Sequence, residues 1–200
     1  MFQSVQYHDV DPTSRPTPKD RLLEALVTHV GERGLADASM RQLAAAIGTS
    51  HRMLAYHFGS RRDLLLAISR AVERQQRAAF NALLADPAAC PTEIMWSMYR
   101  RLVDPALRSQ ERLFFELYAV ALRDGSASDG FLPEVVEAWI PPLSELFRRV
   151  GFDERQAAAE ARLALAVARG LLLDLLAAED RPAVDAAMRR FVSRYEPPAG

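Results

Sequence analysis

The sequence predicts an all-α protein, and three observations lead to this class. Apolar residues recur at intervals of three and four along most of the chain, the spacing of one face of a helix. Several of these stretches begin with a Ser or Thr three positions before a Gln or an acidic residue, as helix capping boxes do. No stretch alternates apolar and polar residues as a half-buried strand does. We expect about nine helices.

The first two helices are predicted from their caps. Thr17 and Asp20, with a proline between them, supply the start of a helix that stops near Gly34. Ser39 and Gln42 form a second capping box, which opens a helix of about two turns. The apolar positions of these two helices are Leu22, Leu23, Leu26, Val27, Val30, Met40, Leu43, Ala44 and Ile47.

A tight turn and two further helices follow. Gly48 can adopt the left-handed conformation that ends the second helix, and the next helical piece covers about residues 51–57. Ser60 with Asp63 is a third cap, which opens a long helix toward residue 84. We therefore expect four helices before residue 86, the second and third joined by a glycine turn.

Beyond residue 86 the chain stays helical. The expected segments are residues 92–107, 113–122, 131–150, 153–179 and a last helix that carries residues 184–195. Pro141 and Pro142 remove two backbone donors, so they must kink or split the helix expected over residues 131–150.

Composition and charge limit the class of protein. A chain of 200 residues, half of them apolar, can bury a core without cross-links, as one ordinary domain or two small ones. Cys90 has no partner in the chain, which excludes an intramolecular disulfide framework and fits a reducing compartment. The first twenty residues lack the apolar run of a signal peptide, and no apolar tract reaches the roughly 18 residues of a membrane span. We expect a soluble, cytoplasmic protein with no membrane partner.

The positive charge is concentrated near the beginning of the chain. Residues 19–62 hold seven cations and four anions, whereas the whole chain has a formal charge of -1. Residues 41–62 contain four arginines and two histidines and no carboxylate. A basic end on a mildly acidic body indicates a modular nucleic-acid-binding protein.

The segment around the glycine turn has the pattern of a helix-turn-helix, whose second helix fits the DNA major groove. An apolar inner face would hold the two helices, and the outer face would offer donors to base edges. The outward residues are Thr49, Ser50, His51, Arg52, Met53, Ala55 and Tyr56. Arg52 can pair with guanine in bidentate fashion. The residues expected at phosphates are Ser39, Arg41, Tyr56, His57, Arg61 and Arg62.

These residues carry a family resemblance. Residues 22–68, and most clearly "SMRQLAAAIGTSHRMLAYHFGSRRDLL", resemble the tetracycline-repressor (TetR) family of bacterial regulators. The resemblance implies a homodimer, with an N-terminal three-helix DNA-binding domain joined by a long helix to a helical domain that binds a small effector and dimerises. The resulting domain prediction is a flexible arm at 1–16, the helix-turn-helix domain at 17–67 and the effector-binding and dimerisation domain at 68–200. The implied partners are a double-stranded DNA operator, a small-molecule effector and a second copy of the chain.

Three positions depart from the family pattern. Ala55 stands where the family usually has a phosphate-contacting tyrosine, although Tyr56 is adjacent. Arg61 replaces a lysine, which keeps the charge and changes its geometry, and Thr49 replaces a valine. Either Tyr56 takes over the missing contact or one phosphate contact is lost.

The chain after residue 90 is rich in aromatic residues and methionine. Such side chains either fill a core or line an adaptable effector cavity. The candidates for the cavity are Met95, Trp96, Met98, Tyr99, Phe114, Phe115, Tyr118, Phe131 and Trp139. We expect no cofactor and no metal, because His51 and His57 fall on different faces of their helix.

The last two helices offer candidates for a dimer interface. Asp174 shares a face with Gly170 and several apolar residues, so we expect it to need a partner, either Arg189 or Arg190 of a second subunit or a polar group of the effector. Arg155, Arg162 and Arg169 recur every seven residues as a polar stripe, solvated or at a rim. The expected seam of a four-helix bundle between two subunits is Gly170, Asp174, Val184, Met188, Phe191 and Tyr195. The alternative is that both helices only close their own domain.

Two other functions compete with that of a DNA-binding regulator. The sequence has no phosphate-binding glycine loop, no nucleophile elbow and no cluster of His, Cys and carboxylates at ligand spacing, so an enzyme is not expected. A helical interaction module with a vestigial DNA-binding half remains the alternative, because of Ala55. The predicted function is a homodimeric repressor that an effector releases from a pseudo-palindromic operator.

Overall fold

The computed structural model describes residues 15–33, 38–123 and 130–196, and all of their regular structure is helical. No strand occurs in these residues, which confirms the all-α prediction; they form ten α-helices rather than about nine. The helices are α1 (Pro18–Arg33), α2 (Met40–Ala46), α3 (His51–Phe58), α4 (Arg61–Leu84), α5 (Pro91–Leu102), α6 (Arg108–Arg123), α7 (Phe131–Glu137), α8 (Ile140–Val150), α9 (Glu154–Ala178) and α10 (Arg181–Val192). Most of the predicted arm at 1–16 lies outside the described residues.

The predicted caps form as the sequence indicates. The Ser39 hydroxyl accepts from the backbone N–H of Gln42 at 3.3 Å, and the Gln42 side chain accepts from the backbone N–H of Ser39 at 2.8 Å. Ser60 and Asp63 pair in the same way at the start of α4. These reciprocal bonds satisfy backbone donors that the first turn of a helix leaves without partners.

Two predicted helices end elsewhere. The helix expected over 92–107 stops at Leu102, and Pro105–Leu107 form a separate 3-10 turn because a proline nitrogen cannot donate to the preceding helical turn. The helix expected over 131–150 is split into α7 and α8. Pro141 and Pro142 lie in the first turn of α8, where a missing N–H costs no helical hydrogen bond.

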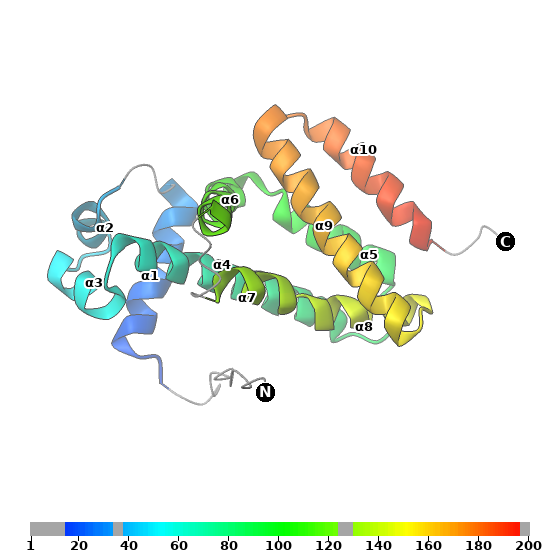
Figure 1. Cartoon of the computed structure of the whole chain (residues 1–200), viewed down its shortest axis with the longest axis horizontal. Helices are drawn as coiled ribbons and strands as arrows, with labels where there is room; N and C mark the ends of the chain where they lie inside the picture. Colours follow the sequence, from blue (N-terminus) through cyan, green and yellow to red (C-terminus); the bar gives the residue numbers. More distant parts are fainter. Residues whose placement is uncertain (1–14, 34–37, 124–129, 197–200) are drawn as a thin grey trace.

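The helices form a small head and a larger body. Helices α1, α2 and α3 gather at one end of the molecule, and α4 runs from this head into the body alongside α7 and α8 (Figure 1). Helix α6 contacts both α1 and α4, and α9 lies across the body with α10 beside it (Figure 1). Helix α4 is therefore the element that physically joins the two parts.

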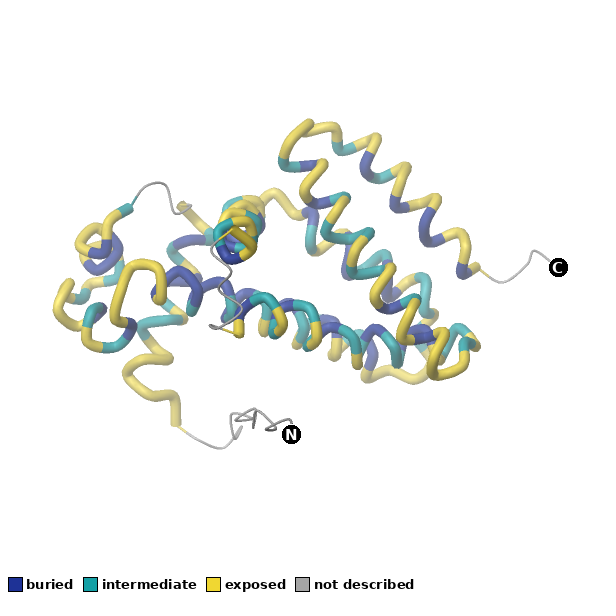
Figure 2. Tube along the Cα trace, viewed as in Figure 1, coloured by how far each residue is buried: buried dark blue, intermediate teal, exposed yellow. Residues whose placement is uncertain are grey.

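Two buried clusters stabilise this arrangement. The first joins the head to α4, α6 and α7, and the second lies among the end of α4 and helices α5, α8, α9 and α10. Phe115 of α6 packs against both clusters. The buried residues follow one side of each helix in Figure 2, and the outer sides of α9 and α10 are exposed. The predicted domain boundary at residue 67 falls within α4 and stays a prediction.

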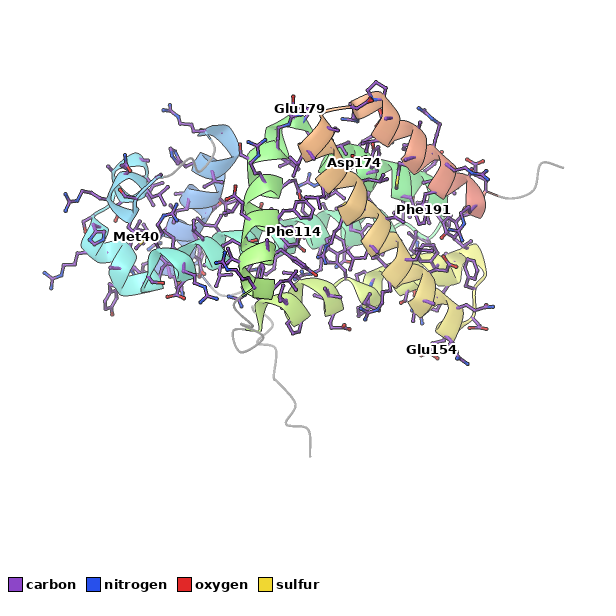
Figure 3. All side chains as sticks on the ribbon, turned by 45° about the horizontal axis from the view of Figure 1, so that its top comes forward. Met40, Phe114, Glu154, Asp174, Glu179 and Phe191 are labelled. Atoms are coloured by element: carbon purple, nitrogen blue, oxygen red, sulfur yellow. The ribbon has the colours of Figure 1, made fainter. Side chains whose placement is uncertain are left out.

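The apolar face of α10 does not lie where the sequence predicted, at an interface between subunits. Val184, Met188, Phe191 and Tyr195 are buried within the chain, between 1% and 8% exposed, in the second cluster. Figure 3 labels Phe191, which belongs to this inward side of α10. The Tyr195 hydroxyl also donates to Glu160 of α9 at 2.6 Å. The assignment of these four side chains to a dimer interface was wrong, because their apolar face closes the chain's own core.

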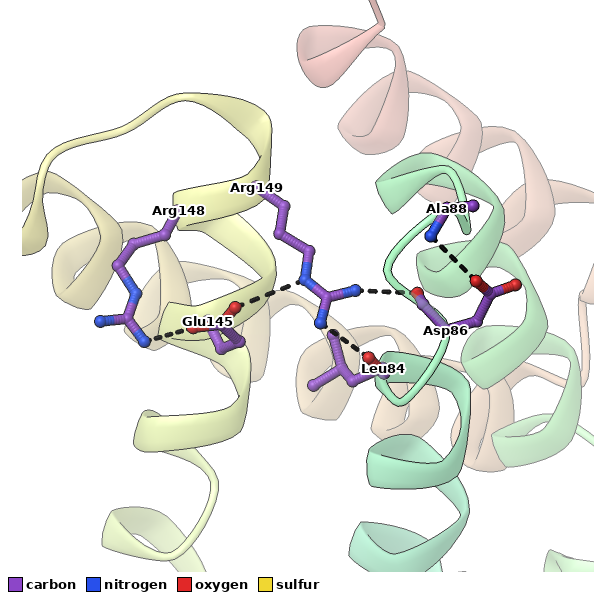
Figure 4. A network of polar contacts seen from close by, with 6 residues as sticks. All are labelled: Leu84, Asp86, Ala88, Glu145, Arg148 and Arg149. Atoms are coloured by element: carbon purple, nitrogen blue, oxygen red, sulfur yellow. Dashed lines mark hydrogen bonds and ion pairs between the residues drawn. The ribbon is translucent and has the colours of Figure 1, made fainter.

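A cluster of polar contacts fixes the far end of α4. The Arg149 guanidinium of α8 donates to the carbonyl oxygens of Leu84 at 2.7 Å and Asp86 at 3.0 Å (Figure 4). Glu145, which also pairs with Arg148, accepts from the Arg149 Nε. Arg149 thus satisfies carbonyls that the end of a helix leaves without partners, and it ties α8 to α4.

Candidate DNA-binding surface and ligand cavity

The turn between α2 and α3 has the backbone that its glycine predicts. Gly48 has a φ of 70°, and the N–H of Thr49 donates to the Ala44 carbonyl at 2.9 Å. Leu43 and Leu54 lie beneath the turn and are fully buried. These contacts hold α3 against α2 and leave its other face toward solvent.

The outer face of this helix pair presents most of the predicted DNA contacts. Met53 is 41% exposed and Tyr56 is 80% exposed, although both are large apolar or aromatic residues. The exposed predicted residues are Ser39, Arg41, Ser50, His51, Arg52, Met53, Tyr56, Arg61 and Arg62. Thr49, Ala55 and His57 are half-buried. We call the exposed surface that residues 39–62 present the recognition face.

The residues around the start of α4 add to this surface. The Arg61 Nε donates to the carbonyl of Ala38 at 3.0 Å, which ties α4 to the residue before the α2 cap. Asp63 is occupied by the Ser60 cap, and those hydrogen bonds lower the pKa of its carboxyl. Lys19, which sequence reasoning missed, has its ammonium 5.5 Å from the centre of the Phe58 ring at the end of α3.

The body holds a buried cavity of about 80 Å³. We call it the inner cavity. It lies among α4, α5, α6, α8 and α9. Its lining residues are Glu73, Gln76, Phe80, Met98, Leu102, Glu111, Phe114, Phe115, Trp139, Leu143, Ala164, Leu165, Ala168, Arg169 and Leu172. Figure 3 shows Phe114 on α6 near the middle of the molecule. Met98, Phe114, Phe115 and Trp139 are the four predicted pocket residues that the structure brings together here.

The other predicted pocket residues lie elsewhere. Met95 and Tyr99 line an adjoining void of about 60 Å³, and Tyr118 lines an open groove of about 530 Å³ between α6 and α9. We call this the outer groove; it shares Phe114, Phe115, Leu165 and Arg169 with the inner cavity. Trp96 stands at a polar surface cleft. Phe131 is 1% exposed in the first buried cluster, so its assignment to the pocket was wrong.

The charged side chains of the inner cavity were missed. Glu73 of α4, Glu111 of α6 and Arg169 of α9 line it together, although they are far apart in the sequence. For Glu111 a local signal existed, because Phe114 and Phe115 stand three and four residues later on the same helical face. Arg169, predicted to belong to a polar stripe, lies instead on the wall between the inner cavity and the outer groove.

Burial changes the pKa values of the charged side chains that line this cavity. Burial raises the pKa of the Glu73 carboxyl, although this group accepts a hydrogen bond from the Trp139 Nε1 at 2.6 Å. Burial and the nearby Glu73 raise the pKa of Glu111 to about 8. Burial also lowers the pKa of Arg169. The Arg169 guanidinium donates to the Val135 carbonyl at 2.6 Å and lies 5.1 Å from the centre of the Phe114 ring.

Within the described ranges, no three His, Cys, Asp or Glu side chains gather closely enough to hold a metal ion. Nor does any helix of the described part combine the length and the apolar character needed to cross a bilayer.

Residues 22–68 match the family model described as "Bacterial regulatory proteins, tetR family". This range contains the recognition face from Ser39 to Arg62 together with most of α1 and the start of α4. Residues 22–68 are thus a TetR-family region. The resemblance noted in the sequence is therefore confirmed, and α3 is the second helix of its helix-turn-helix.

A curated relative extends the similarity into the body of the chain. The HTH-type transcriptional regulator EthR of Mycobacterium tuberculosis is 31% identical over 133 residues. This alignment covers 64% of the present chain and 56% of EthR, so the chain matches only about half the length of this relative.

Solved structures cover more of the chain. A TetR transcriptional regulator from Legionella pneumophila aligns over 91% of this chain and 98% of its own, with a TM-score of 0.69 and 18% identity, which bears on the fold alone. The multidrug binding protein EbrR, complexed with ethidium, aligns over 90% of this chain and 98% of its own, with a TM-score of 0.62 and 26% identity. The arrangement of head and body is thus a known TetR-type fold.

Proposed function

We propose that the chain is a transcriptional repressor that binds an operator as a homodimer and releases it when a small molecule occupies the inner cavity. The observation that carries this proposal is the recognition face. It is cationic and solvent-exposed, and Asp63, the first carboxylate after Arg62 in the sequence, is engaged in the cap of α4. A protein of this kind would act where the chromosome lies, in the cytoplasm.

The proposal gives each part of the recognition face a role. Arg52, on the exposed side of α3, reads guanine in the major groove, and its neighbours contact adjacent base edges. The exposed Tyr56 takes over the phosphate contact that Ala55 cannot make. Arg41, Arg61 and Arg62, with the hydroxyl of Ser39 and the half-buried His57, contact phosphates on either side.

Selection from random duplex DNA tests this role directly. We expect the wild-type protein to enrich one pseudo-palindromic sequence, with a binding constant that falls steeply as salt rises. Arg52→Ala is expected to relax base preference at one position of each half-site, and Arg41→Ala to lower the slope against log salt by about one per half-site contact. Arg155→Ala, an exposed arginine at the far end of α9, is the matched control and should change neither quantity.

An absence of any enriched sequence would overturn the proposal. It would leave the chain as a helical interaction module with a vestigial DNA-binding half. Retained preference at every position in the Arg52→Ala variant would remove only Arg52 from the set of base-reading residues.

The proposed dimer uses the outer face of α9. Exposed small and apolar residues recur there at intervals of three and four, and Leu173 is 51% exposed. The stripe consists of Ala159, Leu163, Ala166, Gly170, Leu173 and Ala177. Gly170 has open space where a Cβ would stand, which lets a second helix approach closely. The exposed Asp174 would then face Arg189 or Arg190 of the partner subunit.

Sedimentation velocity tests this interface. Leu173→Glu places a charge in the centre of the stripe and is expected to shift the protein from dimer to monomer, whereas Ala82→Glu on the exposed side of α4 should leave it dimeric. Asp174→Asn should raise the dimer dissociation constant at neutral pH. A wild-type chain that stays monomeric at micromolar concentration would contradict the proposal.

The connection between cavity and head supports control by an effector. The cavity is lined by α4, which leads directly into the head, and by α6, which contacts α1. Gln110 of α6 donates from Nε2 to the Val27 carbonyl of α1 at 3.4 Å. If α4 and α6 can adopt two arrangements that place the α3 helices of a dimer at different distances, a molecule that binds one arrangement more tightly favours the corresponding distance. The similarity to EbrR, a multidrug binding protein, agrees with a small-molecule effector.

A further inference from the structure

The inner cavity holds more negative than positive charge. Glu73 and Glu111 face it from α4 and α6, and Arg169 reaches its wall from α9. Glu111 is 8% exposed, and Glu73 and Arg169 are only partly exposed. With both carboxylates ionised, the three side chains carry one uncompensated negative charge. A buried site strongly disfavours such a charge.

The three charged groups differ in how they are satisfied. Glu73 accepts the hydrogen bond of the Trp139 indole, and Arg169 donates to the Val135 carbonyl and lies over two aromatic rings. Among the described residues, the Glu111 carboxyl has no hydrogen bond or ion pair. Besides burial, it experiences the Coulombic repulsion of Glu73 and the attraction of Arg169. Glu111 is therefore the buried carboxyl for which the fold supplies no partner.

The walls of the inner cavity suit a cation with apolar substituents. Phe80, Phe114, Phe115 and Trp139 line it, and Met98 adds a polarizable side chain that adapts to different shapes. Aromatic rings attract a cation through their electron-rich faces, and more strongly when water is excluded. An anion has less to gain, because Arg169, the cationic side chain among the described lining residues, already has a carbonyl and two rings as partners.

We propose that the inner cavity binds an apolar organic monocation between Glu73 and Glu111, and that its entry releases one proton from Glu111 to solvent. The inference rests on the proposed effector site and specifies the class of molecule that occupies it. The charge balances on both sides of this exchange. Before binding, protonated Glu111 leaves Glu73 opposite Arg169; after binding, two carboxylates face Arg169 and the ligand cation.

The surroundings of Glu111 fit a proton exchange near neutral pH. Burial and the Glu73 carboxylate hold its pKa at about 8, so it is mostly protonated at pH 7. Glu73 faces it from α4 and Arg169 from α9. Glu111 also borders a second void, of about 130 Å³, whose charged lining residues are Asp104, Arg108, Glu179 and Arg181. Arg108 and Glu179 pair with each other at 3.2 Å.

Three probes of one shape separate charge from size. Phenyltrimethylammonium is a permanent cation, tert-butylbenzene is its neutral isostere and benzenesulfonate is an anion of similar outline. Isothermal titration of the full chain measures each Kd, and parallel titrations in phosphate and Tris give the number of protons released. We expect the cation to bind at least tenfold more tightly than either other probe. Its Kd should fall about tenfold per pH unit between pH 5.5 and 7.5, with about one proton released.

Glu111→Gln keeps the side-chain size and removes the proton exchange. We expect it to weaken binding of the cation at least tenfold at pH 8 and to abolish both the pH slope and the proton release. Glu116→Gln, an exposed carboxylate on the same helix, should leave all three quantities unchanged.

The outcomes separate this inference from the proposed function. If tert-butylbenzene or benzenesulfonate bound as tightly as the cation or more tightly, the preference for a cation would be refuted, but the cavity would still be an effector site. Cation binding without proton release, or with a pH slope that survives in Glu111→Gln, would overturn the role of Glu111. If none of the three probes binds, the inference fails in full, whereas operator binding by the recognition face is measured independently.

Discussion

The buried carboxyl of Glu111 makes the stability of the protein depend on pH in a direction opposite to that of most acidic groups. Burial raises the pKa of this group from the ordinary 4.5 to about 8, so between these pH values the folded chain holds a proton that the unfolded chain releases. The free energy of unfolding therefore falls as pH rises through this window. Glu111→Gln is neutral at every pH, and the variant escapes this loss.

The size of the effect follows from linkage. Each pH unit inside the window costs the wild-type protein about 1.4 kcal/mol relative to the variant, so their unfolding free energies should diverge by about 3 kcal/mol between pH 5 and pH 7. For a chain of this size the divergence corresponds to a difference of about 6 to 12 °C in Tm. Any constant cost of the glutamine amide cancels, because the divergence between two pH values is the measured quantity.

Urea unfolding of both proteins at pH 5, 6 and 7, followed by circular dichroism, measures this divergence. Glu116→Gln is the control, since this carboxylate is exposed on the same helix and should stay within about 0.5 kcal/mol of wild type at each pH. Parallel curves for wild type and Glu111→Gln would refute the reasoning, because they would mean that Glu111 titrates alike in the folded and unfolded chain.

Three further predictions concern packing and caps, each measured by urea unfolding. Ser60→Ala removes the capping box of α4 and should cost about 1 kcal/mol, and Ser60→Asp, which restores an acceptor, should recover most of it. Arg149→Met keeps the apolar stem but removes the donors to the carbonyls of Leu84, the last residue of α4, and Asp86, which should cost roughly 2 kcal/mol. Gly31→Ala would place its Cβ 2.8 Å from the Gln110 amide nitrogen, so it should destabilise the contact between α1 and α6 by about 1 kcal/mol. In a Gln110→Ala background the same substitution should instead stabilise, and no difference between the two backgrounds would contradict the contact.

The head of the molecule was predictable because its signals are local. The capping boxes at Ser39 and Ser60 act over three residues, and the turn at Gly48 depends on one backbone angle. The exposed side of α3 follows from the same short-range periodicity, since buried Leu54 fixes which side faces inward. Local chemistry alone therefore located the recognition face.

The body was less predictable because its features depend on which helices meet. Periodicity showed that Val184, Met188 and Phe191 share a face, but it did not show whether a second subunit or the chain's own core covers that face. Glu73 and Glu111 lie on different helices, and only packing brings them to one cavity. The same limit explains why Phe131 was placed in the pocket rather than in the first buried cluster.

The central claim is that two copies of the recognition face bind successive major grooves. Hydroxyl-radical footprinting on the DNA enriched by selection tests this claim most directly. We predict two protected patches on one side of the duplex, with centres about 34 to 36 Å apart or a multiple of this distance. In the Arg52→Ala variant the protection should weaken in both patches together. A single protected patch, or no protection at concentrations that saturate heparin binding, would contradict the account.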